Sequence, residues 1–164
     1  ESRYQDLRAA DRPRVELPGA VVEVVSGEVS GVRGQAENHW PIHGSVLTLE
    51  PRASVRHELP GDHRAFFFVL AGEASVGGRR MRAGEIGWSD PVAGSPATSH
   101  LDVATGDADG LAQVMVYSGR PVGEPITFGG PFVMNTHAEV EQAYADFRSG
   151  RFGPVPRQAR LRHR

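Results

Sequence analysis

The chain of 164 residues contains no cysteine and no lysine. Without cysteine it cannot form disulfides, thiolate metal sites or a cysteine nucleophile. All 18 of its strongly basic side chains are arginine, so Schiff-base and lysine general-base chemistry are excluded as well. No apolar run approaches the roughly 20 residues needed to cross a bilayer, and the N-terminus does not resemble a signal peptide. We therefore expect a cytoplasmic protein.

Charge is nearly balanced, while turn-forming residues are abundant. The formal net charge of −2 gives no general attraction to nucleic acid or to acidic membranes, so we expect neither as a partner. The chain has 20 glycines, 12 prolines and 39% hydrophobic residues. It is long enough for one domain with a substantial core, and its composition favours many turns over long helices.

Short apolar runs separated by turn signals fill the middle of the chain and predict a series of strands. Many short strands at near-regular spacing are typical of a sandwich or barrel. In Ala65–Leu70 the apolar character is continuous, which predicts a strand that is buried on both faces. The strand candidates are Val21–Gly27, Ser45–Glu50, Ala53–Leu59, Arg64–Gly72, Ala74–Val76, Glu85–Trp88, His100–Ala104 and Leu111–Tyr117.

One helix is predicted near the C-terminus. Thr136 is placed to cap its first turn, and Glu139, three residues later, completes a capping box. Gly150 supplies the left-handed stop. Helical spacing puts four apolar side chains on one face, which we expect to pack on the domain: Val140, Ala143, Tyr144 and Phe147.

Two parts of the sequence together resemble a known family. Phe68–Glu73, followed by Arg82–Glu85, is similar to the central hairpin of cupins. The long stretch Gly123–Gly153 resembles the C-terminal signature of the pirin family, whose members are two tandem cupin barrels. The resemblance extends from Tyr4 to Gly153. It implies an all-β fold, a cupin-type double-stranded β-helix (jelly-roll) barrel with one C-terminal α-helix.

The resemblance also implies how the chain is organised. We expect a single C-terminal pirin-type cupin domain over residues 1–164. Its parts would be an interdomain linker arm (1–18), the barrel (19–130), a C-terminal loop and helix (131–153) and a basic tail (154–164). The pair Tyr4-Gln5 is similar to a segment that joins the two barrels in pirin-like proteins. We therefore expect the chain to correspond to the C-terminal half of a bicupin protein.

In pirins the metal-binding histidines lie in the N-terminal barrel. When the cupin ligand pattern is placed on this chain, the ligand positions fall near Leu59, Gly61 and Ala65, which cannot coordinate a metal. The later histidine would fall near Pro96, several residues from His100. We therefore expect no metal, no cofactor-binding residue and no catalytic residue in this chain.

A different histidine set is the weaker alternative. His57 and His63 flank the Pro60-Gly61 turn, and with His100 on a facing strand, and Glu73 or Glu58, they could form a metal site. The favoured interpretation places His57 at a strand end and His63 on a surface turn. His39 and His43 bracket Trp40, and we expect both at the surface or the rim of the barrel.

Three functions remain open at this point. The first is non-enzymatic: a metal-free barrel with a structural and interaction role beside an N-terminal iron-binding cupin. Its partner would be that cupin or a second copy of this chain, as a homodimer. The second is a part in a quercetinase-type enzyme (quercetin 2,3-dioxygenase-like), because several pirin-like proteins have this activity. The third is a stand-alone barrel that binds a small apolar ligand.

Overall fold

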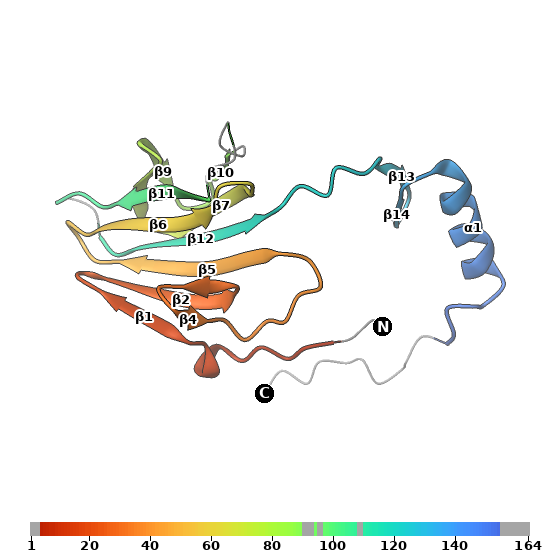
Figure 1. Ribbon diagram of the computed structural model, residues 1–164, viewed down its shortest axis with the longest axis horizontal. Helices are drawn as coiled ribbons and strands as arrows, with labels where there is room; N and C mark the ends of the chain where they lie inside the picture. The colour runs from red at the N-terminus through yellow and green to blue at the C-terminus, as the bar shows by residue number, and fades with distance from the viewer. Residues whose placement is uncertain (1–3, 90–93, 95–96, 108–109, 155–164) are drawn as a thin grey trace. The chain divides into compact units, whose positions relative to one another are not determined.

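The computed structural model describes residues 4–89, 94, 97–107 and 110–154. These residues form two compact units, divided between Pro121 and Val122. The first unit holds strands β1–β12 and the second holds a hairpin and the α-helix (Figure 1). The expected all-β architecture with one C-terminal helix is confirmed. The unit boundary precedes the end of the barrel expected at residue 130.

The first unit begins with a short 3-10 turn, Ala9–Asp11, and continues as two main sheets. The six-stranded sheet has the order β1-β2-β5-β12-β7-β10 and the four-stranded sheet the order β6-β11-β8-β9; β3 and β4 form a separate hairpin. The strands are β1 (Arg14–Leu17), β2 (Ala20–Ser26), β3 (Glu28–Val29), β4 (Val32–Arg33), β5 (Ile42–Leu49), β6 (Ser54–Pro60), β7 (Arg64–Ala71), β8 (Glu73–Val76), β9 (Arg79–Arg82), β10 (Ile86–Ser89), β11 (Thr98–Ala104) and β12 (Ala112–Gly119).

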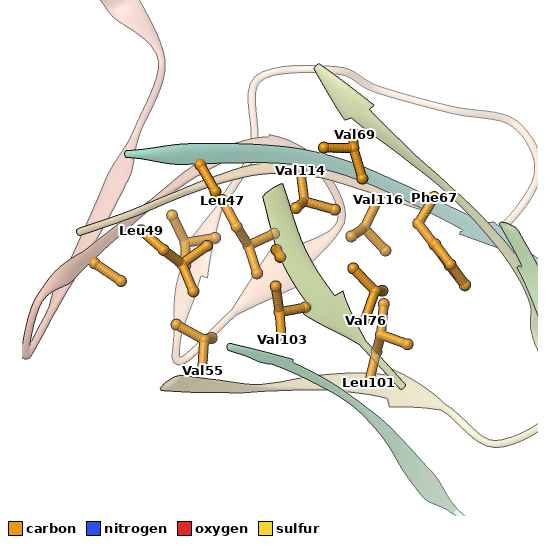
Figure 2. Packing of buried hydrophobic residues seen from close by; sticks show 14 of the residues in the cluster. Leu47, Leu49, Val55, Phe67, Val69, Val76, Leu101, Val103, Val114 and Val116 are labelled. Atoms are coloured by element: carbon orange, nitrogen blue, oxygen red, sulfur yellow. The ribbon is translucent and has the colours of Figure 1, made fainter. Parts of the chain in front are cut away.

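The core lies between the two main sheets. Along β7, Ala65, Phe67 and Val69 are buried and alternate with less buried neighbours, as the two-residue period of a strand requires. Figure 2 shows side chains from both sheets meeting in this layer. The buried hydrophobic residues with 0% exposure are Val22, Val24, Leu47, Leu49, Val69, Ala74, Val103, Ala112 and Val114. Full burial of a valine or leucine side chain contributes roughly 1.5–3 kcal/mol.

The other side of β7 differs from the expectation. Its even-numbered residues Phe66 and Phe68 are only half-buried and Leu70 is exposed, although the sequence predicts a strand buried on both faces. Their side chains point away from the core because those of Ala65, Phe67 and Val69 point into it. The six-stranded sheet therefore has an apolar outer face as well as an apolar inner one.

The second unit contains β13 (Thr127–Gly129), β14 (Phe132–Met134) and α1 (His137–Arg148). Val140 and Ala143 of α1 are buried, and the ring of Tyr144 packs edge-on against Phe132 at 5.0 Å. A Cβ on Gly129 would lie 2.1 Å from Val140, so the helix approaches the hairpin closely. Phe147 is 63% exposed. The predicted apolar face is thus correct for Val140, Ala143 and Tyr144, whereas Phe147 lies outside the contact between the helix and the hairpin.

The capping box is confirmed. The Thr136 hydroxyl accepts from the Glu139 amide, and the Glu139 carboxylate accepts from the Thr136 amide at 2.8 Å. Thr136→Ala should cost this unit about 1 kcal/mol, the usual loss for an N-cap. Amide hydrogen exchange across residues 140–148 should quicken about fivefold, the equivalent rate change. Glu141→Ala, at an exposed site on the same helix, is the control. Equal exchange rates in the two variants would mean that the cap does not stabilise the helix.

Candidate functional site: a buried histidine cluster

Three histidines point into the first unit from two strands and a turn. On β5, His43 shares the inner face with Ser45 and Leu47, because the side-chain period is two. On β6, His57 lies between two buried apolar neighbours of the inner face and is 3% exposed. His63 lies in the turn between β6 and β7 and is 5% exposed. We call these three residues the histidine cluster.

Serine hydroxyls hold two of the three rings. A hydrogen bond of 3.0 Å joins His57 Nε2 to Ser45 Oγ, and a second one of 3.0 Å joins His63 Nδ1 to Ser118 Oγ. The His43 and His63 rings meet edge to face, with centroids 5.3 Å apart. Buried imidazoles are thus fixed in orientation by partners on β5 and β12.

Burial keeps the cluster uncharged at neutral pH. Desolvation, together with a smaller contribution from the neighbouring His43, lowers the pKa of His57 to about 4. Desolvation also lowers the pKa of His63 and that of His43, in the latter case against the opposing influence of Glu28. A neutral imidazole has one N–H donor and one acceptor nitrogen. The cluster therefore offers hydrogen bonds rather than positive charge.

A cavity of about 420 Å³ adjoins the cluster, between β2 and the β3–β4 hairpin on one side and β6 on the other. His43 and His57 form its polar inner wall. The imidazole of His43 packs closely on Gly27, since a Cβ there would lie 2.7 Å from the ring. The apolar part of the lining includes Leu17, Val22, Val29, Val55 and Leu59.

The alternative metal site is not assembled. His100 is exposed on β11, with its side chain on the opposite face from Leu101, so it cannot join His57 and His63. Glu58 lies opposite His100 on that outer face, and Glu73 is paired with Arg80. Within residues 4–89, 94, 97–107 and 110–154, no group of three or more histidine, aspartate or glutamate side chains could hold a metal ion.

The positions expected to correspond to cupin ligands carry no donor side chain. Leu59 and Ala65 are buried in the core, and Gly61 lies in the tight turn before His63. The fourth position, Pro96, lies outside the described residues. Where the cupin pattern has imidazole or carboxylate ligands, this chain has the aliphatic side chains of Leu59 and Ala65 and no side chain at Gly61.

The expected positions of His57 and His63 were wrong. His57 lies in the middle of β6 and is buried, rather than at a strand end. His63 is not on an exposed turn, because the turn folds inward against Ser118. His43, expected at the surface or the rim, is on β5, which begins at Ile42, and is half-buried there. The alternation His43-Ser45-Leu47-Leu49 is a signal that could have placed it on an inner face. His39 is exposed, as expected.

The described part of the chain contains no helix long and apolar enough to span a membrane. The sequence profile of one family, described as the pirin C-terminal cupin domain, matches residues 45–153, well over half of the chain. The chain belongs to the pirin family. The resemblance seen in the hairpin and C-terminal motifs is thereby confirmed, and the pirin profile ends at Gly153, the last residue of the C-terminal stretch that carries the resemblance.

Curated proteins similar to this pirin domain come from bacteria, plants and animals. A quercetin 2,3-dioxygenase-like protein of Pseudomonas aeruginosa is 35% identical over 152 residues, which cover 92% of this chain and 50% of that one. A pirin-like protein of Solanum lycopersicum is 32% identical, covering 93% and 51%. Human pirin is 26% identical, covering 93% and 52%.

A solved structure supports the same assignment. A quercetin 2,3-dioxygenase from Acinetobacter baumannii matches with a TM-score of 0.78 and 28% identity, over 93% of this chain and 51% of that one. The cupin-type fold is confirmed by this similarity and by the family profile. The chain spans about half the length of the curated relatives it matches.

Proposed function

We propose that this pirin domain is a metal-free structural and interaction module that packs against a second cupin barrel. The observation that carries the proposal is the apolar outer face of the six-stranded sheet. In its neighbouring strands β2, β5, β12, β7 and β10, apolar side chains alternate with the core residues and point outward. They are Val21, Val25, Val46, Phe66, Phe68, Leu70, Ile86, Trp88, Met115 and Tyr117.

The aromatic end of this outer face is the most exposed part. Trp88 pairs directly with Phe66 across β10 and β7, with ring centroids 5.3 Å apart, and Phe66 stacks on Tyr117 at 6.1 Å. Trp88 is 70% exposed and Ile86 is 54% exposed. Contiguous apolar surface of this kind, rich in aromatic residues, is typical of protein interfaces. The continuous apolar sequence of β7, characteristic of a strand buried on both faces, is explained if a partner covers this side.

The length of the relatives indicates what covers the outer face of the six-stranded sheet. Those compared above are about twice as long as this chain, and the resemblance to pirins implies a second barrel in them. We therefore assign the outer face to an N-terminal cupin barrel, which would bear the iron. In a sample of this chain alone, a second copy would take its place as a homodimer. Burial of such a face between two barrels removes several large apolar side chains from water.

The interior supports the metal-free part of the proposal. The expected ligand positions Leu59, Gly61 and Ala65 carry no donor side chain, and serine hydroxyls already engage one nitrogen each of His57 and His63. The purified, dialysed chain should contain far less than one equivalent of iron, manganese, nickel or zinc. Elemental analysis measures this directly. One equivalent of metal, lost in His57→Ala and retained in His100→Ala, would contradict the metal-free role.

The second candidate function is a share in quercetin oxidation, favoured by the names of the Pseudomonas and Acinetobacter relatives. Under our proposal, this chain with added ferrous iron should consume oxygen in the presence of quercetin no faster than buffer with iron. The Acinetobacter protein is the positive control. Oxygen uptake that requires both quercetin and this chain would show that the domain itself is catalytic and would overturn the proposal.

A further inference from the structure

The cavity beside the histidine cluster has a feature that the interaction role does not use: free hydrogen-bonding capacity at an apolar wall. Ser45 engages Nε2 of His57, whereas Nδ1 makes no hydrogen bond with any other described residue. In the same part of the chain, neither ring nitrogen of His43 has a hydrogen-bond partner. Among the described residues, neither ring contributes a fully enclosed nitrogen without a partner, so these nitrogens are accessible to a bound molecule. Two imidazoles with unused nitrogens therefore face one cavity.

The charges around the cavity select against ionic ligands. The carboxylate of Glu28 lies at its rim, next to His43, and disfavours an anion, while the guanidinium of Arg56 is held by Asp102 at 3.0 Å. The inner wall is uncharged at neutral pH, as shown above for His43 and His57. A cation inside would lose its hydration against aliphatic side chains, and that loss is large. An uncharged ligand avoids both penalties.

The chemistry of a neutral imidazole further narrows the choice. One ring nitrogen donates and the other accepts, and a hydroxyl group, which does both, is complementary to such a pair. The remaining lining is aliphatic and suits an apolar body. The volume of about 420 Å³ lies within the range of about 300–1,000 Å³ that is usual for small-molecule sites.

We propose that this cavity binds a small uncharged molecule with a compact apolar body and a hydroxyl group. The apolar body lies against Val22, Val55 and Leu59, and the hydroxyl hydrogen-bonds to the imidazoles of His43 and His57. This site is separate from the outer face of the six-stranded sheet, because these residues point to the inner side. It requires no metal and no partner barrel.

The test uses three probes that share one apolar ring: cyclohexylmethanol, cyclohexanecarboxylate and cyclohexylmethylammonium. Long-range proton–nitrogen NMR spectra of the histidine side chains at pH 7 report on each imidazole. We expect cyclohexylmethanol to shift the His57 Nδ1 and His43 signals saturably. We expect both ionic probes to bind at least about tenfold more weakly, because their charges must be desolvated. Equal affinity for the carboxylate, or no shift of these signals, would overturn the proposal.

Variants separate this cavity from the rest of the molecule. His43→Phe removes the hydrogen bond that the imidazole would make to the bound hydroxyl, at a half-buried position, and Val29→Trp fills the cavity. Each variant should weaken cyclohexylmethanol binding at least about tenfold. His100→Phe, on the outer face of β11, is the matched control and should bind as the unaltered chain does. Amide spectra confirm that each variant is folded. Undiminished binding in both cavity variants, or shifts confined to the separate cavity lined by Phe67, Met81 and Trp88, would contradict the assignment.

Discussion

Acidification from pH 7 to pH 4 should lower the free energy of unfolding of the first unit by about 3 kcal/mol through His57 alone. The pKa of His57 is about 4 in the folded chain and 6.5 in the unfolded chain, because burial disfavours the imidazolium. The unfolded state therefore binds the proton more readily. The contribution of His57 to the free energy of unfolding is intact above pH 6.5 and declines as the pH falls below that value. It ceases to decline below the folded pKa of about 4.

The neighbours of His57 add to this loss in the same direction. The pKa values of His43 and His63 are also lowered by burial, so protonation of either ring opposes the folded state. By contrast, Asp102 has a pKa lowered by the hydrogen bond from Arg56, and its contribution is lost only below its ordinary carboxyl range. The histidines therefore determine stability in the window between pH 6.5 and pH 4.

Urea titrations at several pH values measure the effect. His57→Gln keeps a side chain that can hydrogen-bond to Ser45 but does not titrate, so its stability should depend much less on pH in this window. His100→Gln, at an exposed position, should retain the full dependence of the unaltered chain. The same pH profile in His57→Gln and in the unaltered chain would show that His57 is not the buried titrating group.

Much of the fold follows from local sequence patterns. The strands with alternating or continuous apolar residues, such as β6 and β7, were predicted within a few residues, and the capping box of α1 was predicted from Thr136 and Glu139. β9 was missed because its sequence, Arg-Arg-Met-Arg, has a single apolar residue; it forms by pairing with β8. Similarly, β1 lies in a segment that reads as an arm and becomes a strand only beside β2.

The histidine cluster shows where sequence reasoning stops. His43, His57 and His63 come from β5, β6 and a turn, and only the pairing of β5 with β12 and the facing of the two sheets bring them together. Alternation alone could have excluded His100, because Leu101 and Val103 are the inward residues of β11. It could not have shown that serines on β5 and β12 would meet the imidazoles, since that depends on tertiary contact.

Self-association is the second large expected effect. In the absence of another barrel, the outer face of the six-stranded sheet leaves Ile86 and Trp88 exposed beside half-buried Phe66 and Phe68. A two-fold dimer is the simplest closed arrangement that covers one such face with another. We expect this chain to be dimeric at concentrations of tens of micromolar. Replacement of Trp88 by serine should raise the dissociation constant about tenfold or more, because large exposed aromatic residues contribute most of the binding energy of such an interface.

Sedimentation equilibrium of four samples tests the interaction role most directly: the unaltered chain, Ile86→Ser, Trp88→Ser and Val133→Ser. Val133 is the matched control, because it is 58% exposed against 54% for Ile86 and belongs to the second unit. The proposal predicts a dimer for the unaltered chain and for Val133→Ser, and predominantly monomer for the two β10 variants. A strictly monomeric unaltered chain at tens of micromolar, or a dimer that only Val133→Ser weakens, would contradict the assignment of this face.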